Sequence, residues 1–112
     1  MAKKLKAAKK GQDESTQQVY DALKASFPLI PSEPQQVVYR YNPVSIRVRV
    51  IDDSFEGQSV STRLSRVRRS IRSLPQMIQD DITMTLVLTS EEAEDPTALL
   101  SFEFDDPTGS RL

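Results

Sequence analysis

Apolar residues recur along this chain with two periods, one typical of helices and one typical of strands. A first helix is predicted over residues 16–27, where Ser15 and Gln18 fit a capping box at its start. Its apolar residues recur at every fourth position and form one buried stripe: Val19, Leu23 and Phe27. The helix is expected to end at a group of prolines, because proline lacks the backbone N–H and restricts the residue before it: Pro28, Pro31 and Pro34.

A second, longer helix is predicted over residues 59–74, with Ser59 as its N-cap and Pro75 as its stop. Apolar residues follow the helical spacing through the whole segment: Val60, Leu64, Val67, Ile71 and Leu74. We expect this stripe to cover a sheet. The remaining arc of the helix carries the arginines of this segment: Arg63, Arg66, Arg68, Arg69 and Arg72.

Three segments alternate between apolar and polar residues, which is the pattern of strands with one covered face. They are residues 36–41, 44–51 and 82–88. The Asn42–Pro43 pair predicts a tight turn between the first two segments, which would form an antiparallel hairpin. We expect Tyr39 and Tyr41 on the buried face of this hairpin. The apolar face of the middle segment needs a cover: Val44, Ile46, Val48 and Val50.

The order of these elements predicts a small α+β domain of the form α-β-β-α-β, with its helices packed on one face of a three-stranded sheet. Alternation over residues 98–104 adds a candidate fourth strand. We expect a single domain over residues 14–105 and a flexible C-terminal tail over residues 106–112. Residues 1–13 are expected to form a disordered basic arm, because they hold five lysines and only one large apolar residue.

The formal net charge of −1 conceals an asymmetry along the sequence. Residues 1–79 hold 14 Lys/Arg and 7 Asp/Glu, whereas residues 80–112 hold 1 and 9, so the two parts carry +7 and −8. The basic part attracts phosphate, and the acidic part can fold back on it or repel nucleic acid. Since no apolar run reaches the roughly 18 residues of a membrane span, we expect a cytoplasmic protein without a membrane partner.

The chain contains neither cysteine nor histidine. Disulfides, Cys/His zinc sites and triads with a histidine base are therefore excluded, and the serines lack a base to activate them. Gly11, Gly57 and Gly109 are too dispersed for a phosphate-binding loop. Asp52 and Asp53 precede the second helix, where acidic residues favour the helix dipole without any metal. We predict no enzymatic activity, no cofactor and no metal site.

Residues 48–59 combine an apolar strand, a short loop with Phe55 and Gly57, and the start of the second helix. Residues 48–59, VRVIDDSFEGQS, look like the strand, the Ser-Phe-x-Gly-x-Ser type of loop and the helix entry of BolA-like proteins. Arg63 stands where the first arginine of that family's Arg-His-Arg triplet would lie, and the stretch from Leu86 to Glu92 is similar to its last strand and Thr-Pro-Glu-Glu continuation. The resemblance covers about residues 14–95 and implies a class II KH-like fold.

The residues that carry this family's cluster chemistry differ here. Leu64 and Ser65 replace the histidine and the second arginine of the triplet, and Ile82 stands where a histidine usually opens the last strand. The family's association with monothiol glutaredoxins and shared 2Fe–2S clusters needs a histidine or cysteine ligand. We therefore expect no iron–sulfur cluster on this protein.

Five arginines are the candidate binding residues. Arg40, Arg47 and Arg49 are expected on one face of the sheet, on adjacent strands about 4.8 Å apart. Arg66 and Arg69, three residues apart, are expected together on the outer face of the second helix. Like charges crowded on one face destabilise the fold unless partners neutralise them. These partners are either internal, in the acidic C-terminal part of the chain, or external.

Two functions from different classes fit these features. The first is a small, non-enzymatic BolA-like binding module whose basic surfaces contact nucleic acid or an acidic partner. KH-like domains bind nucleic acid through a Gly-x-x-Gly loop, which this chain lacks. The alternative is a protein-interaction or scaffolding domain without nucleic-acid binding, whose arginines face acidic residues 91–106. Salt dependence separates the two, because nucleic-acid binding falls steeply between about 50 and 200 mM salt.

Overall fold

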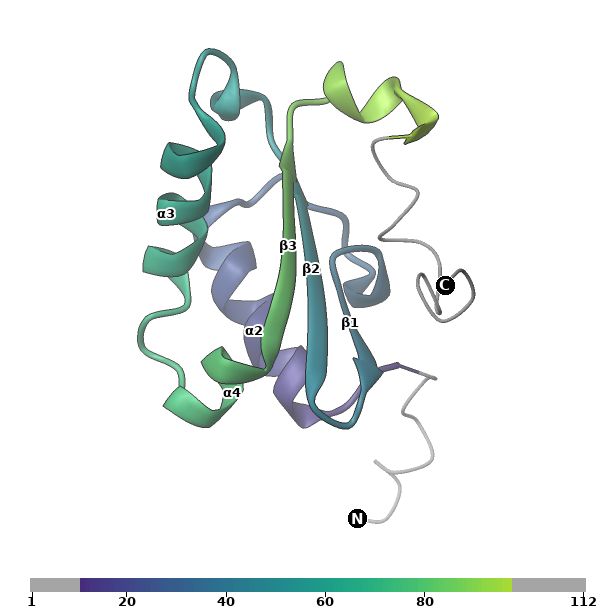
Figure 1. The fold of residues 1–112 in the computed structure, drawn as a ribbon, viewed down its shortest axis with the longest axis vertical. Helices are drawn as coiled ribbons and strands as arrows, with labels where there is room; N and C mark the ends of the chain where they lie inside the picture. The colour runs from purple at the N-terminus through teal and green to yellow at the C-terminus, as the bar shows by residue number, and fades with distance from the viewer. Residues whose placement is uncertain (1–10, 98–112) are drawn as a thin grey trace, which may run out of the picture.

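A computed structural model describes residues 11–97 of the chain. Within this part, helices and strands follow one another in the order α2-β1-β2-α3-α4-β3 (Figure 1). The helices are α2 (Glu14–Ser26), α3 (Val60–Ser70) and α4 (Gln76–Asp81), and the strands are β1 (Val38–Asn42), β2 (Ser45–Ile51) and β3 (Ile82–Leu88). Three short 3₁₀ turns connect them: η1 (Pro34–Gln36), η2 (Asp53–Phe55) and η3 (Glu92–Glu94). The predicted fourth strand over residues 98–104 and the tail over residues 106–112 lie outside the described residues.

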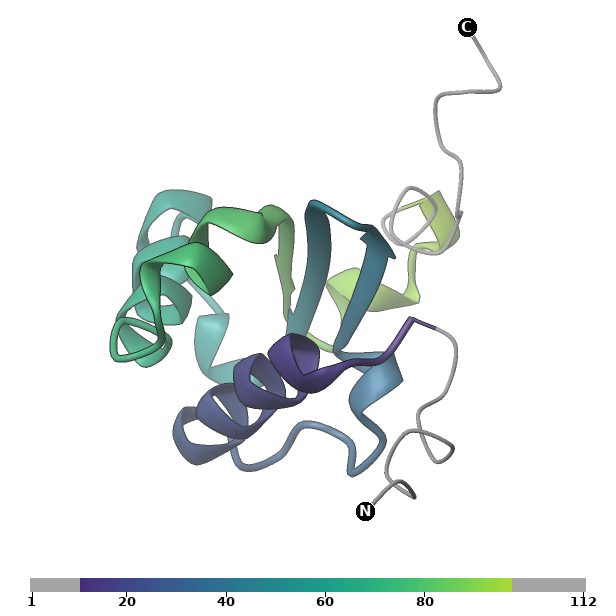
Figure 2. The same cartoon turned by 90° about the horizontal axis from the view of Figure 1, so that it is seen from below.

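The sheet is mixed and has the strand order β1-β2-β3. β1 and β2 pair antiparallel as the predicted hairpin, whereas β2 and β3 pair in parallel. A parallel pair needs a long crossover connection, which α3 and α4 provide. The helices lie on one side of the sheet, as Figure 2 shows most clearly. The prediction of a small α+β domain with helices on one face is therefore confirmed for the described residues.

The core lies between the helices and every second residue of β2. Ile46, Val48 and Val50 are almost fully buried and share one core with the apolar stripes of α2 and α3. Two residues that the sequence placed on buried faces, one of the middle strand and one of the second helix, are exposed instead. Val44 is 67% exposed because it lies in the turn beyond the paired strands, and Val60 is 60% exposed because it opens α3.

The pairing of β1 with β2 corrects the predicted arrangement of the sheet arginines. Arg40 lies opposite the buried Ile46, and Tyr39 lies opposite Arg47. Directly opposite residues point to the same face, so Arg40 points to the helices and Tyr39 lies with Arg47 on the other side. The prediction that Arg40 shares a face with Arg47 and Arg49 is therefore wrong.

The predicted burial of Tyr39 and Tyr41 against the helices is wrong for the same reason. Val37 and Val38 are adjacent apolar residues, and either could have set which face of β1 is buried. The structure places Val38 in the strand opposite Val48, whereas Val37 is buried just before the strand begins. Because side chains alternate with a period of two, this single choice moves every other residue of β1 to the opposite face.

The ends of the predicted helices also differ. α2 begins two residues earlier than expected, with a capping box made by Asp13 and Thr16 rather than by Ser15 and Gln18. The Asp13 carboxylate accepts the Thr16 backbone N–H at 2.9 Å, and the Thr16 hydroxyl accepts that of Asp13 at 2.8 Å. Residues 11–13, which the sequence assigned to the basic arm, thus contact the fold. The Gly11 carbonyl also accepts the backbone N–H of Arg40 at 2.7 Å.

The second predicted helix is shorter than expected, and a further helix follows it in the chain. α3 ends at Ser70, and the sequence analysis did not predict α4, which follows Pro75. The Gln79 side-chain amide donates to the carbonyls of Arg72 and Leu74 at 3.2 and 2.8 Å, which satisfies backbone groups between the two helices. Ser59 is the N-cap of α3, as predicted.

Candidate functional site

Arg40 is held in an internal ion-pair network. Its Nε lies 2.9 Å from Oδ2 of Asp13, and its Nη1 lies 3.0 Å from Oδ2 of Asp81. Nη1 also donates to the Pro43 carbonyl at 3.1 Å. The side chain is 17% exposed and connects the start of α2, strand β1 and the end of α4. Burial lowers the pKa of Arg40, but the carboxylates of Asp81 and Asp13 raise it further, so the net shift is upward. Since both carboxylates and the Pro43 carbonyl hold the guanidinium, we assign Arg40 a structural role.

Arg47 and Arg49 lie on the face of the sheet that points away from α2, α3 and α4. Arg47 is only 8% exposed, because its guanidinium stacks 3.8 Å from the centre of the Tyr41 ring. Its Nη1 donates to the Tyr39 hydroxyl at 3.3 Å. Arg49 donates from Nη2 to the carbonyl of Gln36 at 2.8 Å. Both arginines are therefore packed against the domain itself and do not stand free in solvent.

Arg63 is the residue whose role the sequence analysis missed most completely. It was placed among the solvent-facing arginines of its helix, yet it is 6% exposed. Its Nη1 and Nη2 lie 2.6 and 3.1 Å from the two carboxylate oxygens of Glu92, and its Nε donates to the Gln58 carbonyl at 3.0 Å. Nη1 also donates to the Val87 carbonyl at 3.1 Å. The pair connects α3 to the chain that follows β3.

The same contacts set the charge state of Glu92. The hydrogen bonds from Arg63, aided by the backbone N–H of Thr89, lower the pKa of Glu92 to about 2. One sequence signal for Arg63 was available: Val67 and Ile71 follow it at helical spacing, and the buried stripe of α3 begins at Arg63 rather than at the exposed Val60.

Arg66 has a fixed position and only neutral partners among the described residues. Its Nη2 donates to the Ser54 hydroxyl and its Nη1 to the side-chain carbonyl of Gln58, both at 2.8 Å. The guanidinium also lies 4.9 Å from the centre of the Phe55 ring and 5.5 Å from that of Phe27. Because these partners hold the group in place without neutralising it, its positive charge is available to an anion.

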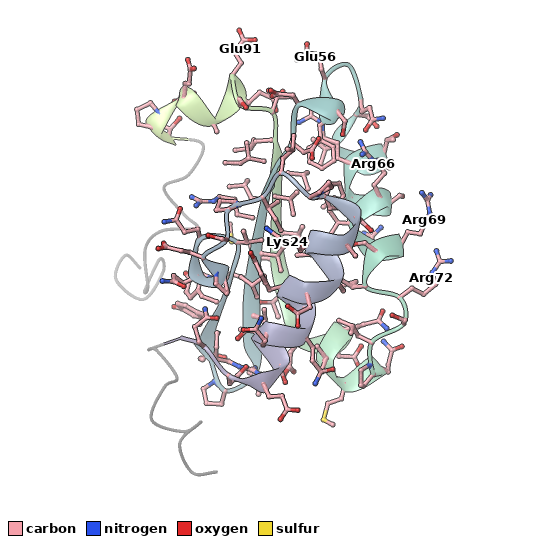
Figure 3. The ribbon with its side chains drawn as sticks, turned by 180° about the vertical axis from the view of Figure 1, so that it is seen from behind. Lys24, Glu56, Arg66, Arg69, Arg72 and Glu91 are labelled. Carbon is pink, nitrogen blue, oxygen red and sulfur yellow. The ribbon has the colours of Figure 1, made fainter. Side chains whose placement is uncertain are left out.

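Three further arginines stand exposed next to Arg66, at the C-terminal half of α3 and just beyond it: Arg68, Arg69 and Arg72. Figure 3 shows Arg66, Arg69 and Arg72 following one another along α3, with Arg69 and Arg72 pointing away from the molecule. Within residues 11–97, none of the side chains of these three exposed arginines makes an ion pair. We call Arg66, Arg68, Arg69 and Arg72 the α3 arginine cluster.

The sequence around this cluster has no counter-charge. Between Glu56 and Asp80 it holds five arginines and no acidic residue. The helix dipole favours Arg68 and Arg69, which lie in the last turn of α3, but this effect does not extend to Arg66. Like charges this close destabilise an empty surface, and a bound anion offsets that cost.

A shallow groove of about 360 Å³ borders the cluster. Its lining residues come from α3, α4 and β3, and Arg68 is among them: Leu64, Val67, Arg68, Ile71, Gln79 and Met84. The aromatic rings nearest to the cluster, Phe27 and Phe55, are 2% and 0% exposed. This surface therefore offers positive charge and aliphatic side chains, and no aromatic ring of the described residues on which a base could stack.

The acidic pair before α3, Asp52 and Asp53, has a structural role. The Asp52 carboxylate accepts the backbone N–H of Ser54, and that of Asp53 accepts the N–H of Ser90. Among residues 11–97 no three acidic side chains converge as metal ligands. In this same part of the chain, every helix is too short or too polar to span a membrane.

Comparisons with known proteins identified no relative of this chain. No protein-family model matches the chain, and the searches of curated proteins and of solved structures found no match.

Proposed function

We propose that this protein is a small, non-enzymatic binding module that holds nucleic acid by its phosphate backbone through the α3 arginine cluster. The observation that carries the proposal is the different state of the arginines. Those on the sheet pack against the domain or pair with its carboxylates, whereas the cluster presents at least three exposed guanidinium groups on one surface. Of the sequence candidates, Arg66 and Arg69 belong to this surface.

Phosphate contacts, rather than base contacts, follow from the chemistry of the cluster. Arginine forms paired hydrogen bonds with phosphate oxygens, and such contacts position a protein without reading sequence. Stacking on bases would need exposed rings, and the two rings beneath this helix are buried. We therefore expect binding that depends strongly on salt and little on sequence.

We also propose kinship with the BolA-like, class II KH-like domains. The element order supports it, since it is α-β-β-α-β apart from the short α4 before the last strand. The loop from Ser54 to the N-cap Ser59 and the short turn at Glu92 support it as well. The missing histidines at Leu64 and Ile82 argue that any shared role lies in binding and not in cluster chemistry.

Fluorescence anisotropy tests the proposal, using labelled duplex and single-stranded DNA and RNA of two unrelated sequences at 25 to 200 mM salt. Four phosphate contacts on a duplex give a slope of about −3.6 in log K against log salt, or about a hundredfold loss between 50 and 200 mM. Arg69→Gln with Arg72→Gln should reduce this slope by about 1.8, equally for both sequences.

The control has the same net charge as the arginine variant, with its substitutions placed elsewhere. Ser32→Glu with Val44→Glu lowers the net charge by the same two units at exposed positions outside α3, so its slope should stay near that of the wild type. NMR shift changes on titration should centre on α3. Absence of binding at 25 mM salt, or unchanged binding by the arginine variant, would refute the proposal and favour the interaction-domain alternative.

A further inference from the structure

The two edges of the sheet differ in how they are covered. At β1, the Gly11 carbonyl accepts the backbone N–H of Arg40 at 2.7 Å, and the Gln12 side-chain amide donates to the Val38 carbonyl at 2.8 Å. β3 forms the other edge, which faces α3 and has no further strand beside it among residues 11–97 (Figure 1). Its sequence, ITMTLVL, holds neither a charged residue nor a proline, the features that commonly keep an edge strand from pairing. The edge at β3 is therefore suited to pairing with another strand.

Two hydrogen bonds show which backbone groups β3 presents at this edge. The Leu88 carbonyl accepts the N–H of Asp52, so Leu88 directs its backbone groups towards β2. Successive residues of a strand alternate in this direction, so Val87 and Thr85 direct theirs away from β2. The Val87 carbonyl agrees with this assignment, because it accepts a hydrogen bond from Arg63 of α3 at 3.1 Å. Thr85 thus directs a backbone N–H and a carbonyl to the open edge, where no group of residues 11–97 bonds to them.

The groove of about 360 Å³ between α3, α4 and β3 lies along this edge, and Thr85 is one of its lining residues. On the α3 side, the groove is lined by aliphatic side chains: Leu64, Val67 and Ile71. Thr85 pairs with the buried Val48, so its side chain points to the same face of the sheet as the core. A residue placed opposite Thr85 in an added strand would point its side chain towards the aliphatic wall. Main-chain hydrogen bonds combined with a pocket for an alternate side chain are the two components of strand addition.

The charge of the groove restricts what can bind there. Arg68 carries the only charge among the lining residues, and it makes no ion pair within residues 11–97. A second copy of the chain, paired through its own β3, would bring two arginine-rich α3 helices together, and like charges repel. No aromatic ring lines the groove, so a nucleic-acid base has no ring on which to stack. An extended peptide with acidic residues suits both the backbone groups and the charge.

We propose that this groove binds an acidic, extended peptide of a partner protein, which adds to β3 as a further strand. The peptide backbone pairs with Thr85, an apolar side chain packs against Leu64 and Ile71, and a neighbouring carboxylate pairs with Arg68. This site goes beyond the proposed function, because the peptide lies between α3 and β3, whereas Arg69 and Arg72 point away from the molecule. It does not depend on nucleic-acid binding.

An NMR titration of the full-length, isotope-labelled chain tests the site. The probe is a capped seven-residue peptide in which glutamate alternates with leucine and valine. Its binding should shift the Thr85 amide resonance and slow the hydrogen exchange of that amide. No shift at millimolar peptide would overturn the proposal. Slow exchange of the Thr85 amide in the free chain would do the same, because the chain itself or a second copy would then already cover the edge.

Two N-methylated forms of the peptide test the strand pairing. They share one sequence and differ in which edge of the peptide backbone carries two methyl groups. One form should bind about tenfold more weakly or worse, because it loses two main-chain hydrogen bonds, and the other should bind like the parent peptide. Equal binding by both forms would overturn the pairing with β3.

Substitutions in the chain give an independent measurement. Arg68→Gln should weaken peptide binding about two- to fivefold, whereas Lys24→Gln, which removes the same charge from α2, should leave it unchanged. Equal effects of the two variants would contradict the role of Arg68. Thr85→Pro removes the N–H at the open edge, a position where a strand tolerates proline, and should abolish peptide binding while affinity for duplex DNA stays the same. Should Thr85→Pro fail to fold, the methylated peptides decide.

Single-stranded DNA separates this site from the proposed function. It should shift amide resonances of α3 around Arg69 and leave the Thr85 amide unchanged. A shift of the Thr85 amide with DNA but not with the peptide would assign the groove to nucleic acid and overturn the peptide site. A shift with the peptide, in a chain that binds no nucleic acid, would support the peptide site and refute only the proposed function.

Discussion

Phe55 is the side chain whose removal tests the packing beneath the α3 arginine cluster most directly. It is fully buried in the loop between β2 and α3, and its ring centre lies 5.7 Å from that of Phe27 at an interplanar angle of 57°. The guanidinium groups of Arg63 and Arg66 lie 5.6 and 4.9 Å from it. One ring therefore supports both the buried arginine and the first residue of the cluster.

Replacing Phe55 by alanine should be strongly destabilising. A fully buried phenylalanine costs about 3–5 kcal/mol when truncated to alanine, because the apolar burial is lost and a cavity remains. Small domains have about 5–15 kcal/mol in total, so this loss is a large part of the stability. With a urea m-value of about 1.5 kcal/mol/M, a loss of 4 kcal/mol lowers the midpoint by about 2.7 M.

The assay is urea unfolding followed by far-UV circular dichroism, with Phe55→Leu as the matched variant that retains apolar volume. Combined with Phe27→Leu in a double-mutant cycle, Phe55→Leu should show a coupling of about 0.5–1.5 kcal/mol, as tilted aromatic pairs do. A loss below about 1 kcal/mol for Phe55→Ala would refute the described burial of this ring, since surface substitutions stay within about 0.5 kcal/mol.

Four further predictions concern other places in the molecule. The free energy of unfolding should fall as the pH drops from about 4.5 towards 2, because the pKa of Glu92 is lowered in the folded state and protonation removes its ionic contact with Arg63. In a plot of stability against pH, Glu92→Gln should therefore show a smaller loss in this acid range. Val67→Asp should abolish cooperative thermal unfolding, because it buries an uncompensated charge in the core; a normal melting transition would contradict the packing of α3. Asp13→Ala should cost about 1 kcal/mol in urea unfolding through loss of the α2 cap, and an unchanged midpoint would contradict that role. Mixing the protein with a glutaredoxin that carries an iron–sulfur cluster should produce no absorption band that depends on side chains of this chain, since Leu64 and Ile82 occupy the family's histidine positions.

The sequence by itself determined the elements that depend on local patterns. β3 runs from Ile82 to Leu88 as predicted, because its alternation is clear and the segments on either side are polar. The stripes of α2 and α3 supplied most of the helical core, since a buried helix face must repeat with the helical period. The absence of histidine and cysteine excluded several kinds of chemistry without any structure.

Only the tertiary structure decided which charged side chains face inward. Arg40 meets Asp81, 41 residues later, and Arg63 meets Glu92, 29 residues later, and no local period encodes such a pairing. The face of β1 depended on whether Val37 or Val38 entered the sheet, which the register with β2 resolved. The candidate site changed for the same reason. Contacts between distant segments hold Arg40 in an ion-pair network, whereas the α3 arginine cluster has no such acidic partner among the described residues. Burial and charge neutralisation depend on neighbours in space and not on neighbours in sequence.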